Sequence, residues 1–155
     1  REHVRFEWTK ECQEAFDELK TRISDKTILV PYVPHLDTRL YVDHGPAGIA
    51  STLAQKHDGR DKEVWKAVHH MSRSLVKSET NYNKVEGESL AIYSRILMNR
   101  KYMLGTNFMV MIDHSEMLAL YNNTGRPAPH WVDRHRGRLR AFNMKVQYML
   151  GNKNP

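Results

Sequence analysis

The stretch 40–49 constrains the fold most, because an apolar run ends there on a single acidic residue before the chain turns back. Residues 40–42 are typical of a β-strand, and the glycines and proline of 45–48 are typical of a tight turn. Asp43 lies between them. A carboxylate at the end of a buried strand loses hydration unless it is paired or binds a metal ion. Asp43 is therefore the first candidate for a functional residue.

The composition indicates one globular domain. The chain has 155 residues, of which 40% are hydrophobic and 27% charged, and this allows a single domain with a real core. The longest apolar runs are too short to span a bilayer, and the first residues do not resemble a signal peptide, so we expect a cytoplasmic protein. The one cysteine, Cys12, excludes an internal disulfide and a cysteine-based zinc site.

Positive charge gathers toward the C-terminal end. The net charge is +6, and residues 114–155 contain seven Lys or Arg and only two acidic residues. A basic segment of this kind suits a polyanion such as nucleic acid, or it is a solvated basic face. Charge alone leaves both interpretations open.

An amphipathic helix is predicted at the N-terminal end, with Thr9 as its N-cap. The apolar residues that recur at three- and four-residue steps are Phe6, Trp8, Cys12, Ala15, Phe16, Leu19 and Ile23. Cys12 falls on this stripe, so we expect it to be a small core residue. Pro31 and Pro34 then predict an extended connector that sets the helix apart.

The remaining pattern predicts a mixed α/β domain. Strands are predicted at 39–43, 49–56, 63–71, 107–112 and 145–150, and helices at 84–100, 114–121 and 131–142. The first three strands are joined by short turns and predict an antiparallel meander. Helices precede the last two strands, which predicts a partly parallel sheet.

Three acidic residues stand out by their positions. Asp43 and Asp113 are each the first polar residue after a strand-like run, and each precedes a histidine. Glu88 lies in the longest predicted helix and shares a face with the apolar residues 91–92. Glu86 is the competing acid in this helix. Carboxylate oxygens suit Mg²⁺ or Mn²⁺, but strand-end aspartates also commonly cap the next turn or helix, so spacing leaves the role open.

Motifs in a fixed order extend along nearly the whole chain. The N-terminal motifs are Phe6-Glu7-Trp8, Cys12, Ala15-Phe16 and Leu19-Lys20. The central motifs are Val42-Asp43, Gly48-Ile49, Leu53-Ala54-Gln55, Ser72-Arg73-x-Leu75, Glu79-x-Asn81-Tyr82, Glu86-x-Glu88-x-Leu90-Ala91, Tyr102, Gly105, Phe108, Val110, Asp113-His114 and Leu118. The C-terminal motifs are Trp131, Leu139, Phe142, Tyr148, Gly151 and Asn154. In this order they resemble the ribonuclease H region of the Pol polyprotein of gypsy-type LTR retrotransposons.

The resemblance implies a ribonuclease H-like α/β fold. Its five-stranded mixed sheet has three antiparallel and then two parallel strands, flanked by helices, with an extra N-terminal helix. Residues 1–35 would be the helix and connector from the polymerase connection region. Residues 36–155 would be the ribonuclease H-like domain, truncated at its C-terminal end.

The resemblance also implies an activity, which is hydrolysis of the RNA strand of an RNA–DNA hybrid during reverse transcription. Asp43 would bridge two Mg²⁺ ions, with Mn²⁺ as a substitute, and Glu88 and Asp113 would hold the second ion. Besides the hybrid, the implied partners are the polymerase and connection domains of the parent polyprotein, inside virus-like particles. Three residues are candidates for nucleic-acid binding, namely His114, Arg134 and Arg138. The alternatives are a turn or capping role for His114 and an ordinary solvated helix face for the two arginines.

The sequence departs from the family pattern at three places, one of which is His130-Trp131 where the family usually has Arg-Trp. The family's fourth aspartate follows the asparagine seen here at 154, and this chain stops at Pro155. Val42-Asp43-His44-Gly45 also stands where the family has Thr-Asp-Ala-Ser. The alternative function is therefore a catalytically impaired domain that binds hybrid or serves as a structural module of a reverse transcriptase.

Overall fold

The structure is a computed structural model that describes residues 6–24, 29–58, 63–123, 125 and 127–149. Its helices are α1 (Lys10–Ser24), α2 (Lys84–Met98), α3 (Arg100–Met103), α4 (Glu116–Asn122) and α5 (His130–Leu139), with a 3-10 turn η1 (Glu79–Asn81). Its strands are β1 (Thr38–His44), β2 (Gly48–Asp58), β3 (Glu63–Ser74), β4 (Asn107–Ile112) and β5 (Asn143–Tyr148). All five strands therefore occur where the sequence predicts them, with ends that shift by a few residues.

The five strands form one sheet in the order β3-β2-β1-β4-β5. β1 pairs antiparallel with β2, and β2 pairs antiparallel with β3. β4 runs parallel to β1 on one side and to β5 on the other. The predicted mixed sheet of three antiparallel and two parallel strands is confirmed. Because β1 and β4 are parallel neighbours, their carboxyl ends meet at the same edge of the sheet.

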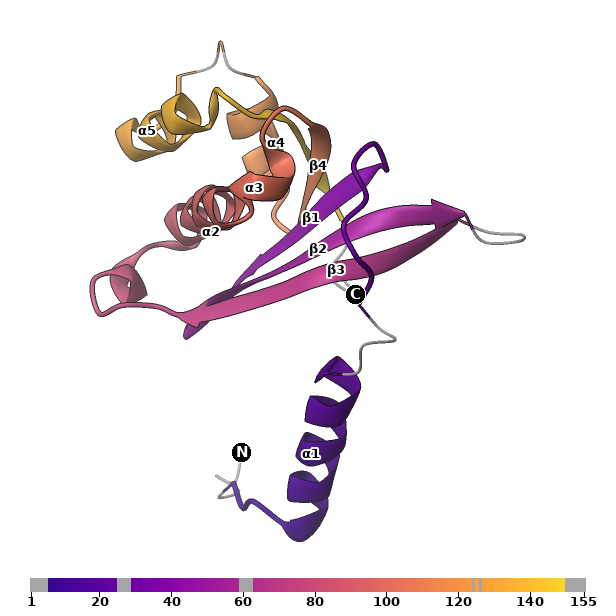
Figure 1. Ribbon diagram of the computed structural model, residues 1–155. Helices are drawn as coiled ribbons and strands as arrows, with labels where there is room; N and C mark the ends of the chain where they lie inside the picture. Colours follow the sequence, from indigo (N-terminus) through magenta and orange to yellow (C-terminus); the bar gives the residue numbers. More distant parts are fainter. Residues whose placement is uncertain (1–5, 25–28, 59–62, 124, 126, 150–155) are drawn as a thin grey trace.

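The main core lies between the sheet and helices α2–α5, which gather over one face of it (Figure 1). Side chains alternate along β1, so Leu40 and Val42 enter this core. Tyr41 points to the opposite face, where it packs in a smaller apolar cluster with Met111. Phe142 is buried in the main core, and its ring meets that of Phe108 edge-on.

Helix α1 stands apart from the sheet in Figure 1. Thr9 caps it as predicted, since the Cys12 amide donates a hydrogen bond to the Thr9 hydroxyl at 3.3 Å. The predicted core role of Cys12 is wrong, because the cysteine is partly exposed and the stripe around it is open to solvent. Phe16 and Ile23 are 46% and 57% exposed, so the other described elements do not cover this stripe.

The connector after α1 is fixed against the sheet by hydrogen bonds. The Val30 amide donates to the Ala67 carbonyl at 2.9 Å. The buried Gln55 side chain accepts a hydrogen bond from the Val33 amide and donates one to the Val33 carbonyl, at 2.8 Å each.

Among the described residues, none of the helices has the length and apolar composition needed to cross a bilayer.

Candidate active site

The two strand-end aspartates lie at one edge of the sheet. Asp43 is the penultimate residue of β1, and Asp113 directly follows β4. The parallel register pairs Tyr41 with Met111, so each aspartate lies two residues beyond a paired position. Both side chains are exposed at this edge. The sequence predicted this proximity, since both acids end strands that point the same way.

Glu88 approaches the same edge from α2. It is only 1% exposed, and its Oε2 atom has no hydrogen-bond partner among the described residues. Burial raises the pKa of Glu88 to about 7, and the negative charges of Asp113 and then Asp43 add to the increase. Lys84 opposes this shift only in part. The three acids that the sequence singled out therefore form one electrostatic unit.

Glu86, the competing acid, has a structural role. Asn83 is the N-cap of α2, and its side chain accepts a hydrogen bond from the Glu86 amide at 2.9 Å. The Glu86 carboxylate in turn accepts a hydrogen bond from the Asn83 backbone amide at 2.9 Å, which completes a capping box. The fold therefore uses Glu86 to begin the helix, while the buried Oε2 atom of Glu88 has no hydrogen-bond partner in the described part of the chain.

Replacing Glu86 should weaken folding without affecting the carboxylate edge. We expect Glu86→Ala to lower the free energy of unfolding by about 1 kcal/mol, because one end of the capping box is lost. Urea unfolding followed by circular dichroism measures this change, with Glu116→Ala as a control at an exposed acid in the first turn of α4. A loss of hybrid cleavage larger than the loss of folded protein would contradict this assignment.

The donor set suits a hard divalent cation, because it consists of carboxylates, one with an unpartnered buried oxygen. However, in the part of the chain that the structure describes, no three His, Cys, Asp or Glu side chains are already arranged to hold a metal ion. Alternation along β1 gives a reason. The last side chain of β1, that of His44, lies against α2 at Gly87, and Asp43 alternates away from Val42 and the main core. Metal binding by the three acids stays a prediction.

Residues 8–110 match a family described as "RNase H-like domain found in reverse transcriptase". The chain belongs to this family. The match covers α1, α2 and most of the sheet, and it includes Asp43 of β1 and Glu88 of α2. The resemblance inferred from the ordered motifs is thereby confirmed.

Individual proteins agree with the family assignment. The RNase H-like domain is 30% identical to the retrovirus-related Pol polyprotein from transposon 412 of Drosophila melanogaster, over 99% of this chain and 12% of that polyprotein. Its fold is similar to the Prototype Foamy Virus protease–reverse transcriptase, with a TM-score of 0.71, 13% identity, and coverage of 95% of this chain and 19% of that one. A structure of the foamy viral protein in complex with an RNA/DNA hybrid aligns with a TM-score of 0.60 and 12% identity, over 96% of this chain and 20% of that one.

A free-standing enzyme shows the same fold. RNase H1 from Halobacterium salinarum aligns with a TM-score of 0.57 and 15% identity, over 76% of this chain and 89% of that protein. The RNase H-like domain thus corresponds to nearly the whole of that protein. It corresponds to only about an eighth of the transposon polyprotein.

The three residues assigned to nucleic-acid binding have different environments. His114 directly follows Asp113, and its Nδ1 atom is buried without a described partner. Arg134 is exposed on α5. Arg138 is also exposed, but it donates a hydrogen bond to the Tyr93 hydroxyl of α2 at 2.6 Å. Arg134 is therefore the more available of the two arginines, and none of the three assignments is tested by these contacts.

Sequence reasoning missed a buried network beside Glu88. The Ser89 hydroxyl lies 2.7 Å from the Tyr121 hydroxyl and 2.9 Å from Nδ1 of His135. Burial raises the pKa of Tyr121 to about 12. Burial, followed by the charges of nearby arginines, lowers the pKa of His135. The network ties α2 to α4 and α5 and holds the segment that carries Glu88, but three residues so far apart in sequence give no local signal.

Proposed function

We propose that this RNase H-like domain hydrolyses the RNA strand of RNA–DNA hybrids with the help of divalent metal ions. The observation that carries the proposal is the shared electrostatic site of Asp43, Glu88 and Asp113, where like charges and burial raise the pKa of Glu88. A carboxylate held in this way gains from a bound cation, which removes the repulsion that its neighbours impose.

Asp43, Glu88 and Asp113 would hold Mg²⁺, or Mn²⁺ in its place. When bound, such ions supply a Lewis acid for the scissile phosphate and lower the pKa of the attacking water. The protein contributes the fixed positions of the acids, two at the ends of parallel strands and one on the helix packed over them. The buried position of Glu88 also keeps bulk water from competing for its oxygens.

The choice of substrate rests on the relatives and on charge. The foamy viral protease–reverse transcriptase, which shares the fold, has a solved structure in complex with an RNA/DNA hybrid. A net charge of +6 favours association with a polyanion. The transposon 412 relative is far longer than this chain, so we propose that the domain works beside the polymerase and connection domains of a Pol polyprotein, inside the cell.

A cleavage assay tests the proposal. A hybrid labelled on the RNA strand should be cut in Mg²⁺ or Mn²⁺ and left intact in EDTA, while duplex DNA should not be cut, because contacts to the 2′-hydroxyl distinguish RNA. A folded domain that leaves the hybrid intact under all of these conditions would rule out the nuclease.

A second function is a hybrid-binding module without nuclease activity. It is favoured by the observation that the described residues contain no preformed group of three metal ligands. This alternative predicts salt-dependent binding of the hybrid, measured by fluorescence anisotropy, with no cleavage at any concentration of Mg²⁺. Detectable metal-dependent cutting would exclude it.

Arg134 should contribute to either function through a phosphate contact. We expect Arg134→Ala to weaken hybrid binding and to reduce the slope of log affinity against log salt by about 1, because one counterion fewer is released. Anisotropy titrations at several salt concentrations measure the slope. Arg140→Ala, at an exposed arginine just beyond α5, is the matched control. An equal change in both variants would show that net charge acts without a defined contact.

A further inference from the structure

The His44 imidazole occupies the place that a side chain at Gly87 would fill. A Cβ atom built on Gly87 would overlap three ring atoms of His44, namely Cε1, Nε2 and Nδ1. Gly87 is buried in α2 directly before Glu88, and His44 directly follows Asp43 at the end of β1. The contact therefore joins the residues next to two of the three candidate acids.

The His44 ring is half-buried and lies against α2. Its Nε2 atom is buried and has no hydrogen-bond partner among the described residues. The turn that follows closes with a hydrogen bond from the Gly45 amide to the Gly48 carbonyl at 2.9 Å. A Cβ atom at Gly48 would lie 2.7 Å from the Arg73 carbonyl oxygen, so this turn is pressed against the end of β3. The turn directly after His44 is thus closed on itself and packed against the end of β3.

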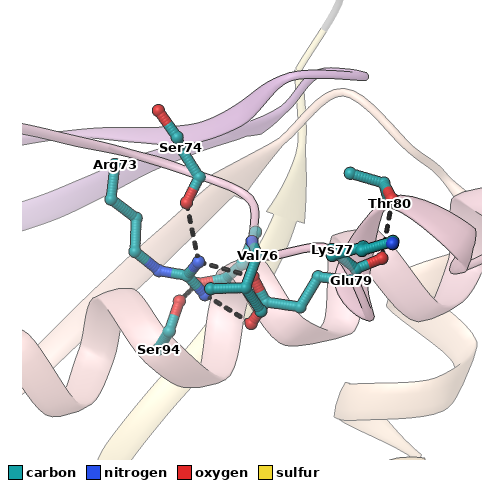
Figure 2. A network of polar contacts seen from close by, with 8 residues as sticks. Arg73, Ser74, Val76, Lys77, Glu79, Thr80 and Ser94 are labelled. Carbon is teal, nitrogen blue, oxygen red and sulfur yellow. Dashed lines mark hydrogen bonds and ion pairs between the residues drawn. The ribbon is translucent and has the colours of Figure 1, made fainter.

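The segment leading into α2 is anchored at the same place. Arg73 at the end of β3 donates two hydrogen bonds to Glu79 of η1, at 2.6 and 2.9 Å (Figure 2). The bond from Arg73 lowers the pKa of Glu79, and the charge of His44 contributes to this shift, so His44 lies within electrostatic reach of the pair. The half-buried imidazole therefore lies against α2 at Gly87 and within electrostatic reach of the Arg73–Glu79 pair.

We propose that His44 is a positioning residue whose ring, seated on Gly87, sets the spacing between the end of β1 and the first turns of α2. This spacing fixes Asp43 relative to Glu88, and thus the geometry in which the two carboxylates can bind a cation together. The catalytic consequence rests on the proposed nuclease function, whereas the steric coupling of residues 44 and 87 does not. Because the ring leaves no room for a Cβ atom, the identities of these two residues depend on each other.

The test is a double-mutant cycle of Gly87→Ala, His44→Ala and the two combined. Gly137→Ala is the matched control, since Gly137 lies in α5 with open space around its Cβ position. Isothermal titration calorimetry with Mn²⁺ reports cation binding without any nuclease assay. Cleavage of a labelled hybrid reports kcat and KM separately.

We expect Gly87→Ala to weaken Mn²⁺ binding about tenfold, the loss typical when a residue that orients a ligand is disturbed. The same variant should lower kcat and leave KM for the hybrid unchanged. In the double variant the space left by the imidazole accepts the new methyl group, so the melting temperature and Mn²⁺ affinity should recover above those of Gly87→Ala. Gly137→Ala should leave Mn²⁺ binding and cleavage as they are.

The two substitutions could be coupled in their effects on the melting temperature while Mn²⁺ affinity stays the same in all variants. This result would overturn the proposal, because His44 would then be a packing residue only. Independent effects of the two substitutions would also overturn it. If the effects of the two substitutions on Mn²⁺ affinity are coupled but neither the unmodified chain nor any variant cuts the hybrid, the positioning role stands and the nuclease function fails. An unmodified chain that does not bind Mn²⁺ would contradict both.

Discussion

Asp43→Asn should abolish metal-dependent cleavage of an RNA–DNA hybrid while the fold stays intact. Asn keeps the size of the side chain but removes the charge that attracts a cation. Disturbing residues that only orient metal ligands costs 10–100-fold in activity, so we expect the loss of a direct ligand to reach at least about 100-fold. Because Asp43 is exposed, the substitution creates no cavity and the melting temperature should change little.

Asp133→Asn is the matched control for this experiment. Asp133 is exposed on α5 and pairs with the mostly buried Arg136 at 3.1 Å, and Asn keeps an oxygen that can accept the same hydrogen bond. Cleavage by this variant should equal that of the unmodified chain. Full activity of Asp43→Asn, or an equal loss in the two variants, would refute the role given to Asp43.

The sequence was sufficient to predict the elements that bring the acids together. Asp43 and Asp113 each end an apolar run, and a helical crossover between parallel strands places such ends at one edge. Glu88 could be preferred over Glu86 from helical periodicity, and the capping box explains why the second acid is not part of the site. Local patterns carried these predictions because each depends on residues within a few positions of one another.

Contacts between distant segments could not be predicted in this way. The fit of His44 on Gly87 joins residues that are 43 positions apart in the sequence, and nothing in the local pattern of either element predicts their contact. The stripe on α1 shows the opposite failure. Its spacing predicts burial, but exposure depends on what lies against the helix, and Phe16 stays 46% exposed. Periodicity tells which face is apolar, and only the tertiary structure tells what that face meets.

Glu88→Gln should stabilise the protein at neutral pH when divalent ions are absent. The pKa of Glu88 is about 7 in the folded state, against an ordinary value of 4.5. Between these two values the folded state binds more protons than the unfolded state, so stability falls as the pH rises from 4.5 to about 7. Below this pH range Glu88 is protonated in both the folded and the unfolded state. Above it Glu88 is ionised in both states, and the folded state carries the full free-energy penalty of the buried charge. The shift corresponds to at most about 3 kcal/mol at high pH.

Glutamine has nearly the shape of a protonated glutamate but does not ionise. In EDTA the unfolding free energies of Glu88→Gln and the unmodified chain should agree at about pH 4 and diverge by up to about 3 kcal/mol at about pH 8. Saturating Mg²⁺ should then stabilise the unmodified chain at high pH much more than Glu88→Gln, because a ligand that binds only the folded state shifts the equilibrium toward it. A constant difference across the pH range would show that burial of Glu88 carries no charge penalty. Equal stabilisation of both proteins by Mg²⁺ would show that Glu88 is not a metal ligand. Of the three acids, only Asp43 and Asp113 would then remain as candidate ligands.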